Sequence, residues 1–286
     1  MSQIDLSEQQ VKAIIDLALA EDTGKGDVTS DILISPELNC GASLLVKAEG
    51  VLAGGEIARK VFLRVDPTLK VDLLLKDGVK ISPGDIIGTV SGRVISILKA
   101  ERVVLNFIQR LSGIASQTAQ FVTKVEGYKA KIVDTRKTTP GLRTLEKYAV
   151  RMGGGQNHRM HLGDAILIKD NHIAVLRREG MTLQEIVMKA KNAAPAGIVV
   201  EVEVTTPQEA EEAARAGATM IMFDNMAPDE MRRAINLLPE GVRTEASGGI
   251  NLENVRAAAM TGVDIISIGA LTHSVKALDI SLELEF

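Results

Sequence analysis

The chain has 286 residues, 45% hydrophobic and 24% charged, which is the composition of a globular protein with one large domain or two modest ones. Its formal net charge of −4 excludes a protein-wide field that attracts nucleic acid or anionic membranes. One cysteine excludes an intrachain disulfide, and no apolar run approaches the ~18–20 residues of a membrane span. The first ten residues do not resemble a secretory leader, so we expect a cytoplasmic protein.

The first third of the sequence mixes helical and extended patterns. Apolar residues at helical spacing predict a helix that Ser7 caps and that ends near Leu19. Extended runs closed by glycine turns follow at 42–54, 70–78 and 85–92. A helix is predicted between the first two of these runs, over 55–65.

A long helical pattern covers residues 97–125, and after it the sequence changes to a regular alternation of strand and helix patterns. Its apolar stripe consists of Val104, Phe107, Ile108, Leu111 and Ala115. We place the boundary between two domains inside or just after this segment. The tail at 277–286 alternates like a strand, and we expect it to return to the first domain.

From residue 131 onward, short β-branched runs alternate with helical patterns. The runs lie at 131–135, 165–169, 198–204, 219–223, 242–246 and 264–268. Helices are predicted at 142–152, 182–193, 207–216, 228–237 and 251–260. This alternation is typical of parallel β/α architecture, and six strands, with a seventh that we cannot place, favour an α/β barrel over an open sheet.

Polar residues and glycines follow every one of these predicted strands. In an α/β barrel the active site forms at the carboxyl ends of the strands, so these residues are expected to share one mouth. The cations among them bind carboxylates and phosphates. They are Arg136, Lys137, His158, Arg159 and Lys169. Arg143 and Arg151 lie on a predicted helix, where an ion pair or a surface position explains them as well.

Acids and glycines complete the predicted mouth. Glu203 and Asp224 end adjacent strands, where two carboxylates could share Mg²⁺, partly through substrate and water. Glu201 points to the same face as Glu203, but we interpret it as structural. Glycine turns after the last two strands predict a phosphate cradle. They contain Ser247, Gly248, Gly249, Ile268, Gly269 and Ala270.

Long motifs of this sequence closely resemble the quinolinate phosphoribosyltransferase family. They are "DTRKTTPGLRTLEKYAVRMGGGQNHRMHLGDAILIKDNH" from residue 134, then "VEVEV", "MFDN", "EASGGI" and "IGALTHS", with "GDVTS", "LAGG" and "ERVVLNFIQRLSGIA" in the first domain. The resemblance implies an open α/β sandwich domain over 1–115, joined by the strand at 277–286, and a seven-stranded α/β barrel over 116–276. It also implies a dimer or a larger homo-oligomer.

The implied reaction belongs to NAD biosynthesis. Quinolinate and 5-phosphoribosyl 1-pyrophosphate react with Mg²⁺ to give nicotinate mononucleotide, pyrophosphate and CO₂. By the family pattern, quinolinate is held by Thr135, Arg136, His158, Arg159 and Lys169, with Arg102 from the neighbouring subunit. The phosphoribosyl donor is held by Lys137, Glu203, Asp224, Ser247, Gly248, Gly249, Ile268, Gly269, Ala270 and His273. Lys137, Lys169, Glu203 and Asp224 are the implied catalytic residues.

Three other functions compete with this one. A transferase of the same fold could act on nicotinate, although the full cation set with Arg102 favours a diacid. A phosphate-binding aldolase could use Lys169 as a Schiff-base lysine. A non-catalytic binding module would leave the paired acids unexplained. Cys40 lies outside every motif and is interpreted as a small buried hydrophobic residue.

Overall fold

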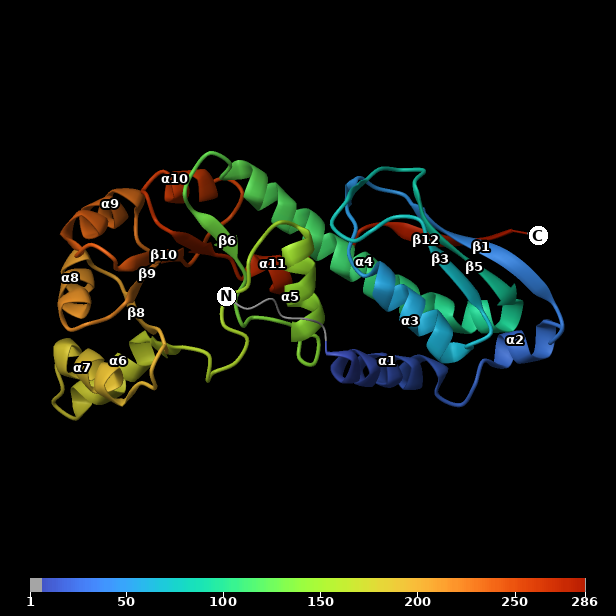
Figure 1. Cartoon of the computed structure of the whole chain (residues 1–286), viewed down its shortest axis with the longest axis horizontal. Helices are drawn as coiled ribbons and strands as arrows, with labels where there is room; N and C mark the ends of the chain where they lie inside the picture. The colour runs from blue at the N-terminus through green and yellow to red at the C-terminus, as the bar shows by residue number, and fades with distance from the viewer. Residues whose placement is uncertain (1–6, 286) are drawn as a thin grey trace. The chain divides into compact units, whose positions relative to one another are not determined.

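The computed structural model describes residues 7–285, which form two compact units (Figure 1). The first unit contains the residues up to Ala119, Thr138–Gly154 and the residues from Leu271 onward. The second contains Gln120–Lys137 and Gly155–Ala270. Within the described part, no helix is both long and apolar enough to cross a bilayer. The predicted division of the sequence at residue 115 stays a prediction.

A four-stranded antiparallel sheet forms the first unit. Its order is β12-β1-β5-β3, and the strands are β1 (Asn39–Val46), β3 (Lys70–Leu73), β5 (Ile86–Arg93) and β12 (Ile280–Glu285). β12 pairs with β1 so that Leu282 lies opposite Leu44. Residues 280–285 therefore lie beside the first strand. Short strands β2 (Gly50–Val51) and β4 (Lys80–Ile81) form a separate pair.

Helix α1 confirms the predicted cap but corrects the predicted end. It covers Glu8–Thr23, and the hydroxyl of Ser7 accepts a bond from the backbone N–H of Gln10 at 3.5 Å. The predicted end near Leu19 is wrong because no residue breaks the helix before Gly24, whose φ is +41°. Helix α2 (Val28–Leu33) was not predicted, since six residues are too few to show an apolar period. Helix α3 covers Gly55–Val65, as predicted.

Helix α4 (Val94–Lys124) runs through the core of the first unit, and its predicted apolar stripe is confirmed. Each of the five stripe residues is at most 8% exposed. The hydroxyl of Ser112 accepts a bond from the backbone N–H of Ala53 at 3.1 Å, and the side-chain amide of Gln109 donates to the Ile280 carbonyl at 2.6 Å. Cys40 is buried on β1, and burial raises the pKa of its thiol.

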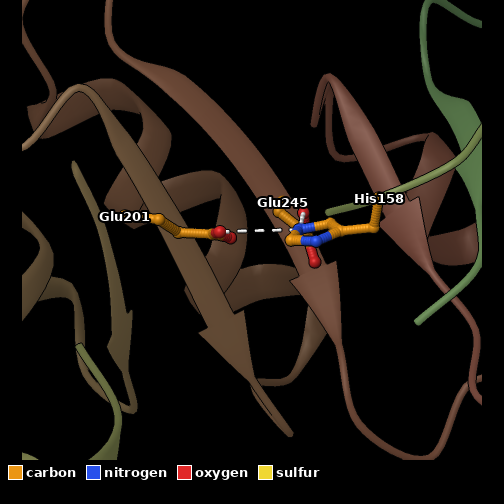
Figure 2. Close-up of side chains that lie close together, drawn as sticks. All are labelled: His158, Glu201 and Glu245. Carbon is orange, nitrogen blue, oxygen red and sulfur yellow. Dashed lines mark ion pairs between the residues drawn. The ribbon is translucent and has the colours of Figure 1, made fainter. Parts of the chain in front are cut away.

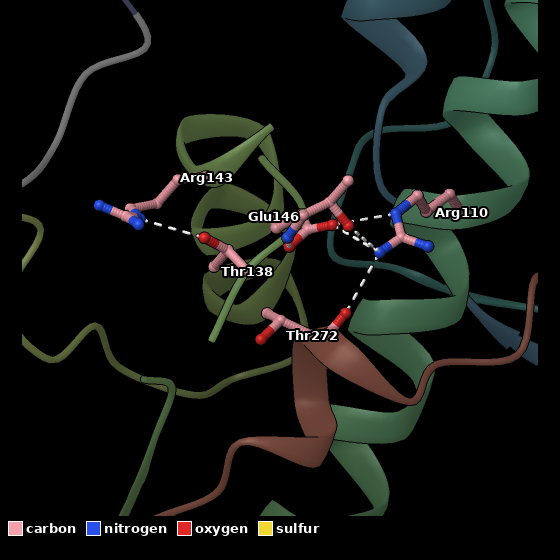
Figure 3. Close-up of polar contacts among 6 residues, drawn as sticks. Arg110, Thr138, Arg143, Glu146 and Thr272 are labelled. Carbon is pink, nitrogen blue, oxygen red and sulfur yellow. Dashed lines mark hydrogen bonds and ion pairs between the residues drawn. The ribbon is translucent and has the colours of Figure 1, made fainter. Parts of the chain in front are cut away.

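A network of polar contacts joins α4 to helix α5 (Arg143–Met152), as Figure 3 shows. Arg110 Nε and Nη2 donate to Glu146 Oε1 at 2.9 and 2.6 Å, and Glu146 Oε2 accepts the backbone N–H of Thr139 at 3.0 Å. Arg110 Nη2 also reaches the Thr139 hydroxyl and the Thr272 carbonyl. The Glu146 side chain is completely buried, so these donors replace the water that it loses.

The second unit contains a six-stranded parallel sheet in the order β6-β11-β10-β9-β8-β7. Its strands confirm the six predicted runs. They are β6 (Lys131–Val133), β7 (Ile166–Ile168), β8 (Val200–Val204), β9 (Met220–Asp224), β10 (Arg243–Ser247) and β11 (Ile265–Ser267). The predicted parallel α/β barrel architecture is confirmed, although residues 7–285 contain six strands of the parallel sheet and no full seventh strand. In its place Gln156 makes a single parallel bridge to Val133, because the glycine-rich segment before it does not extend the pairing.

Helices connect these strands and lie outside them (Figure 1). They are α6 (Asp170–Arg178), α7 (Leu183–Ala193), α8 (Pro207–Arg215), α9 (Pro228–Leu237) and α10 (Val255–Ala259), followed by the short α11 (Ala270–His273). Helix α8 begins with an N-cap residue, since the Thr206 hydroxyl accepts a hydrogen bond from the backbone N–H of Glu209 at 3.2 Å. Helix α6 was not predicted, because its polar start had been interpreted only as a strand end.

Strand register places alternate residues on a common face of this sheet. Val133, Met220 and Ile265 pack together as an apolar cluster. Glu201 is paired with Met220, and Glu203 and Glu245 are both paired with Met222. Because side chains alternate between faces, these three glutamates share the face of that cluster.

Candidate active site

A cavity of about 440 Å³ opens in the second unit, where the parallel strands end. Most of the predicted site residues line it, which confirms that the strand ends share one mouth. These residues are Thr135, Arg136, Lys137, His158, Arg159, Lys169, Glu203, Asp224, Ser247, Gly248 and Gly249. The roles assigned to them individually stay predictions.

Five predicted residues do not line this cavity. Ile268, Gly269 and Ala270 follow β11, and Ile268 is buried with its backbone N–H bonded to the Val133 carbonyl at 3.0 Å. Arg102 on α4 and His273 on α11 belong to the first unit. Their predicted roles remain predictions.

Five other residues line the cavity although the sequence analysis did not assign them to the site. They are Leu167, Met222, Asn225, Glu245 and Ser267. Strand periodicity could have identified most of them. Leu167, Met222 and Glu245 each lie two positions before a predicted site residue, and a spacing of two keeps side chains on one face.

The cations of the cavity are close enough to influence one another. Burial lowers the pKa of Arg159, and the charge of Arg136 lowers it further, while Glu201 opposes both effects. Arg159 Nη1 donates to the Ala165 carbonyl at 3.2 Å, which steadies its side chain. The backbone N–H of Lys169 donates to His172 Nδ1 at 3.0 Å, so this histidine caps α6. Two neighbouring guanidinium groups and nearby lysines form a site for a multiply charged anion.

The acids of the cavity also repel one another. Burial raises the pKa of Glu203, the charge of Asp224 raises it further, and Lys169 lowers it. The side-chain amide of Asn225 donates to Asp224 Oδ2 at 3.0 Å and orients that carboxylate. A cation or hydroxyl groups placed between Glu203 and Asp224 would relieve their repulsion.

The turn after β10 depends on an unusual backbone. Gly248 and Gly249 have φ values of +84° and +61°, and Asn225 has φ of +52°. A Cβ atom at Gly248 would overlap the Asn225 side chain, so glycine is required there. The backbone N–H of Asn225 donates to the Ser247 carbonyl at 2.9 Å. This close approach of two strand ends leaves a glycine turn at the edge of the cavity, which is the arrangement that suits a phosphate.

His158 extends toward two buried glutamates from neighbouring parts of the sheet (Figure 2). Its Nε2 lies 3.4 Å from Glu201 Oε2 and 3.2 Å from Glu245 Oε2. The side chains of these residues are 11%, 1% and 0% exposed, in the order His158, Glu201 and Glu245. Burial alone would lower the pKa of the imidazole, but the two carboxylates outweigh it and raise the pKa of His158 to about 10.

Comparison with known proteins identifies one family over most of the chain. Residues 114–283 match the model of the quinolinate phosphoribosyl transferase C-terminal domain, and residues 27–112 match that of the N-terminal domain. The chain is 46% identical over 279 residues to a probable nicotinate-nucleotide pyrophosphorylase (carboxylating) of Bacillus subtilis, covering 98% of this chain and 95% of the relative. It is 42% identical to a decarboxylating quinolinate phosphoribosyltransferase of Nicotiana tabacum, covering 96% and 82%. The solved nicotinate-nucleotide pyrophosphorylase of Francisella tularensis is 39% identical over the full length of both chains, with a TM-score of 0.92.

Proposed function

The chain belongs to the quinolinate phosphoribosyltransferase family, and from that membership we propose which residues of its cavity carry out the reaction. The enzyme converts quinolinate and 5-phosphoribosyl 1-pyrophosphate to nicotinate mononucleotide, pyrophosphate and CO₂ in NAD biosynthesis. The observation that carries the proposal is the cavity itself. Its lining combines cations, which we call the cationic wall, with paired carboxylates and a glycine turn.

The cationic wall holds quinolinate. Its two adjacent carboxylates match the neighbouring guanidinium groups of Arg136 and Arg159, whose mutual repulsion a dianion relieves. His158 and Lys169 add charge to the lining of the cavity, and Thr135 adds a hydroxyl. A single carboxylate, as in nicotinate, would leave part of this charge unbalanced. The arrangement therefore favours the diacid as substrate.

The paired carboxylates and the glycine turn, together with two lysines, hold the phosphoribosyl donor. Lys137 and Lys169 face the pyrophosphate, and Glu203 and Asp224 face the ribose hydroxyls. Ser247, Gly248 and Gly249 receive the 5′-phosphate on their backbone N–H groups, together with Gly269 and Ala270 after β11. The positive φ angles of Gly248 and Gly249 support this assignment, since such turns aim consecutive N–H groups at one anion.

The same carboxylates suit Mg²⁺. Glu203 and Asp224 supply hard oxygen ligands, and the raised pKa of Glu203 reflects burial together with a like charge that a divalent cation would offset. We propose that the ion is bound partly through substrate oxygens and water. When bound, it supplies positive charge to the departing pyrophosphate.

The chemistry needs no nucleophilic side chain. As the C1′–O bond to pyrophosphate breaks, Lys137 and Lys169 stabilise the charge that develops on the leaving oxygen. Positive charge develops at C1′, and a carboxylate of Glu203 or Asp224 stabilises it. The pyridine nitrogen of quinolinate then forms the new bond to C1′. The positively charged ring accepts the electron pair released when the 2-carboxylate leaves as CO₂, and a proton takes its place.

The direct test is an assay of the purified chain with quinolinate, 5-phosphoribosyl 1-pyrophosphate and Mg²⁺. We expect nicotinate mononucleotide, pyrophosphate and CO₂ in equal amounts. A parallel reaction with nicotinate in place of quinolinate should be far slower and release no CO₂. Faster turnover of nicotinate than of quinolinate would overturn the assignment of the cationic wall to a diacid.

We propose further that the enzyme is a homodimer or larger assembly in which Arg102 completes the neighbour's site. Arg102 lies on α4 but off its buried apolar stripe, and its side chain is exposed, which suits a role outside its own core. Loss of a buried charge-assisted contact costs about 2–5 kcal/mol, so Arg102→Ala should bind quinolinate much more weakly.

A mixing experiment tests this assignment. Inactive Arg102→Ala and inactive Lys137→Ala chains, mixed so that subunits exchange, should regain activity because a mixed dimer contains one site with neither lesion. Mixed assemblies that form but stay inactive would show that Arg102 does not act across an interface.

A further inference from the structure

Two buried carboxylates in the second unit have no part in the steps above. Glu201 on β8 and Glu245 on β10 point to the barrel face that carries the apolar cluster of Val133, Met220 and Ile265. Glu245 lines the cavity, and both side chains are at most 1% exposed. Placing carboxylates next to an apolar cluster is costly unless a partner compensates them. Their shared partner is the ring of His158.

The contacts between these three residues are incomplete as hydrogen bonds. Both carboxylates approach the same atom, His158 Nε2, at 3.4 and 3.2 Å. Among the described residues, Glu201 Oε1 and both oxygens of Glu245 accept no hydrogen bond of good geometry. Two carboxylates thus surround one ring nitrogen without being satisfied elsewhere. This pattern differs from a structural ion pair, in which each oxygen has its own donor.

We infer that Glu201 and Glu245 are positioning residues that hold the His158 ring charged and in one orientation for a carboxylate of the substrate. The inference rests on the proposed role of His158 in binding quinolinate and deepens it. A neutral imidazole offers a carboxylate one N–H at most, whereas an imidazolium also offers charge. Charge-assisted contacts of this kind are the stronger ones.

The other charged groups around His158 are consistent with this role. Asp134, which directly follows β6, accepts the backbone N–H of His158 at 2.9 Å and holds this part of the chain in place. Arg159 follows in the sequence, and its charge interacts with Glu201 and with Arg136. Glu201 and Glu245 are therefore the carboxylates that contact the ring nitrogen. With their help, the raised pKa of His158 keeps the ring charged across the neutral range.

A spectroscopic experiment measures the charge of the ring without substrate. The chain has four histidines, and a His158→Asn variant identifies the imidazole signals of His158 in ¹⁵N NMR spectra. In the unaltered protein we expect both ring nitrogens to stay protonated at pH 8. In Glu245→Gln, and separately in Glu201→Gln, the pKa should fall by about one to three units. A neutral ring at pH 8 in the unaltered protein would overturn the inference, even if neither variant folds.

A kinetic experiment measures the consequence for catalysis. In Glu245→Gln the KM for quinolinate should rise as the pH increases from 6 to 9, because the ring loses its proton within that range. The KM for the phosphoribosyl donor should stay nearly constant. The control Glu240→Gln removes a negative charge from an exposed position of the same unit and should change neither value. A pH profile of Glu245→Gln that matches the unaltered enzyme would contradict the inference.

Two further outcomes separate this inference from its alternatives. The three residues also offer ligand atoms within 4.8 Å of one another, a spacing that a metal ion could use. Stoichiometric zinc in the purified protein that Glu245→Gln abolishes would overturn the inference, since a metal ligand requires a neutral imidazole. If instead His158→Asn leaves the KM for quinolinate unchanged while the ring is charged in NMR spectra, the proposed binding role of His158 fails, and with it the purpose inferred for the two carboxylates.

Discussion

Both units of this protein contain buried glutamate side chains, but the hydrogen bonding of these carboxylates differs between the two units. In the first unit, Glu146 accepts two bonds from Arg110 on one oxygen and a backbone N–H on the other. In the second, Glu201 and Glu245 share one nitrogen of His158 and leave three oxygens without a hydrogen bond. Equal burial therefore does not mean an equal role. A fully satisfied carboxylate stabilises the fold, while an incompletely satisfied one next to a cavity is retained for what it does there.

The largest expected effect tests the structural side of this comparison. Replacing Arg110 by methionine leaves Glu146 buried without its main partner, and breaking a buried pair in this way costs roughly 3 kcal/mol or more. We expect the thermal midpoint to fall by about 6–12 °C. Scanning calorimetry of both proteins under the same conditions measures this. An unchanged midpoint would mean that the network seen in Figure 3 contributes little to stability.

The next prediction tests the functional side. Lys137→Ala and Lys169→Ala should each lower kcat by about 10²–10³-fold, because each removes a charge that stabilises the leaving pyrophosphate. The thermal midpoint should remain close to that of the unaltered protein, since both residues line the cavity. Steady-state kinetics and calorimetry on the same samples give both values. Near-normal turnover in both variants would remove these lysines from the leaving-group role.

Much of the fold was predictable because the periodicities of this sequence are strong. All six parallel strands lie within two residues of their predicted ranges, and the stripe of α4 is buried as expected. The misses have local causes. Helix α2 is too short to show a period, and the single bridge of Gln156 is too short to count as a strand. The resemblance to the family implied seven strands, whereas the structure has six strands and a single bridge between Gln156 and Val133.

The site was predictable only where its chemistry lies at strand ends. Arg136, Lys169 and Asp224 were found in this way. Glu245 was given no role because it lies two positions before Ser247, inside its strand, and nothing local to it indicates a partner. The approach of two glutamates from β8 and β10 to one histidine depends on how the segment that carries His158 packs against the sheet, which no local pattern specifies. Only the three-dimensional structure could therefore distinguish the satisfied carboxylate from the unsatisfied pair.

A smaller effect is expected at the proposed metal site. Asp224→Asn removes one negative charge from the pair with Glu203, so the concentration of Mg²⁺ needed for half-maximal activity should rise by about an order of magnitude. Thermal stability should barely change, because an ion that arrives with substrate is not part of the folded apoprotein. Activity measured over a series of Mg²⁺ concentrations tests this. Full activity of the unaltered enzyme in excess chelator would remove both residues from the metal role.

The smallest effect sharpens the comparison of the buried carboxylates directly. Glu146→Gln and Glu245→Gln are the same chemical change at two completely buried positions. In Glu146→Gln the new amide N–H₂ faces donors, and an unsatisfied buried group costs about 1–3 kcal/mol. In Glu245→Gln no hydrogen bond of good geometry is lost, and Glu201 remains to balance the imidazolium. We therefore expect Glu245→Gln to change the free energy of unfolding at pH 7 by less than about 1 kcal/mol, which is less than the change in Glu146→Gln.

The difference in stability between the unaltered protein and Glu245→Gln should depend on pH, because His158 is charged over a different pH range in each. Its pKa is about 10 in the folded protein against about 6.5 in an unfolded chain, so the folded state binds more protons between these values. The stabilisation is present in full below pH 6.5 and is lost as the pH rises toward 10. Because Glu245→Gln lowers the folded pKa, the stability of the variant should stop falling at a lower pH, whereas that of the unaltered protein keeps falling toward pH 10. Thermal midpoints of both proteins, measured from pH 6 to 9, should therefore diverge as the pH rises, and parallel curves would show that Glu245 does not raise the pKa of His158.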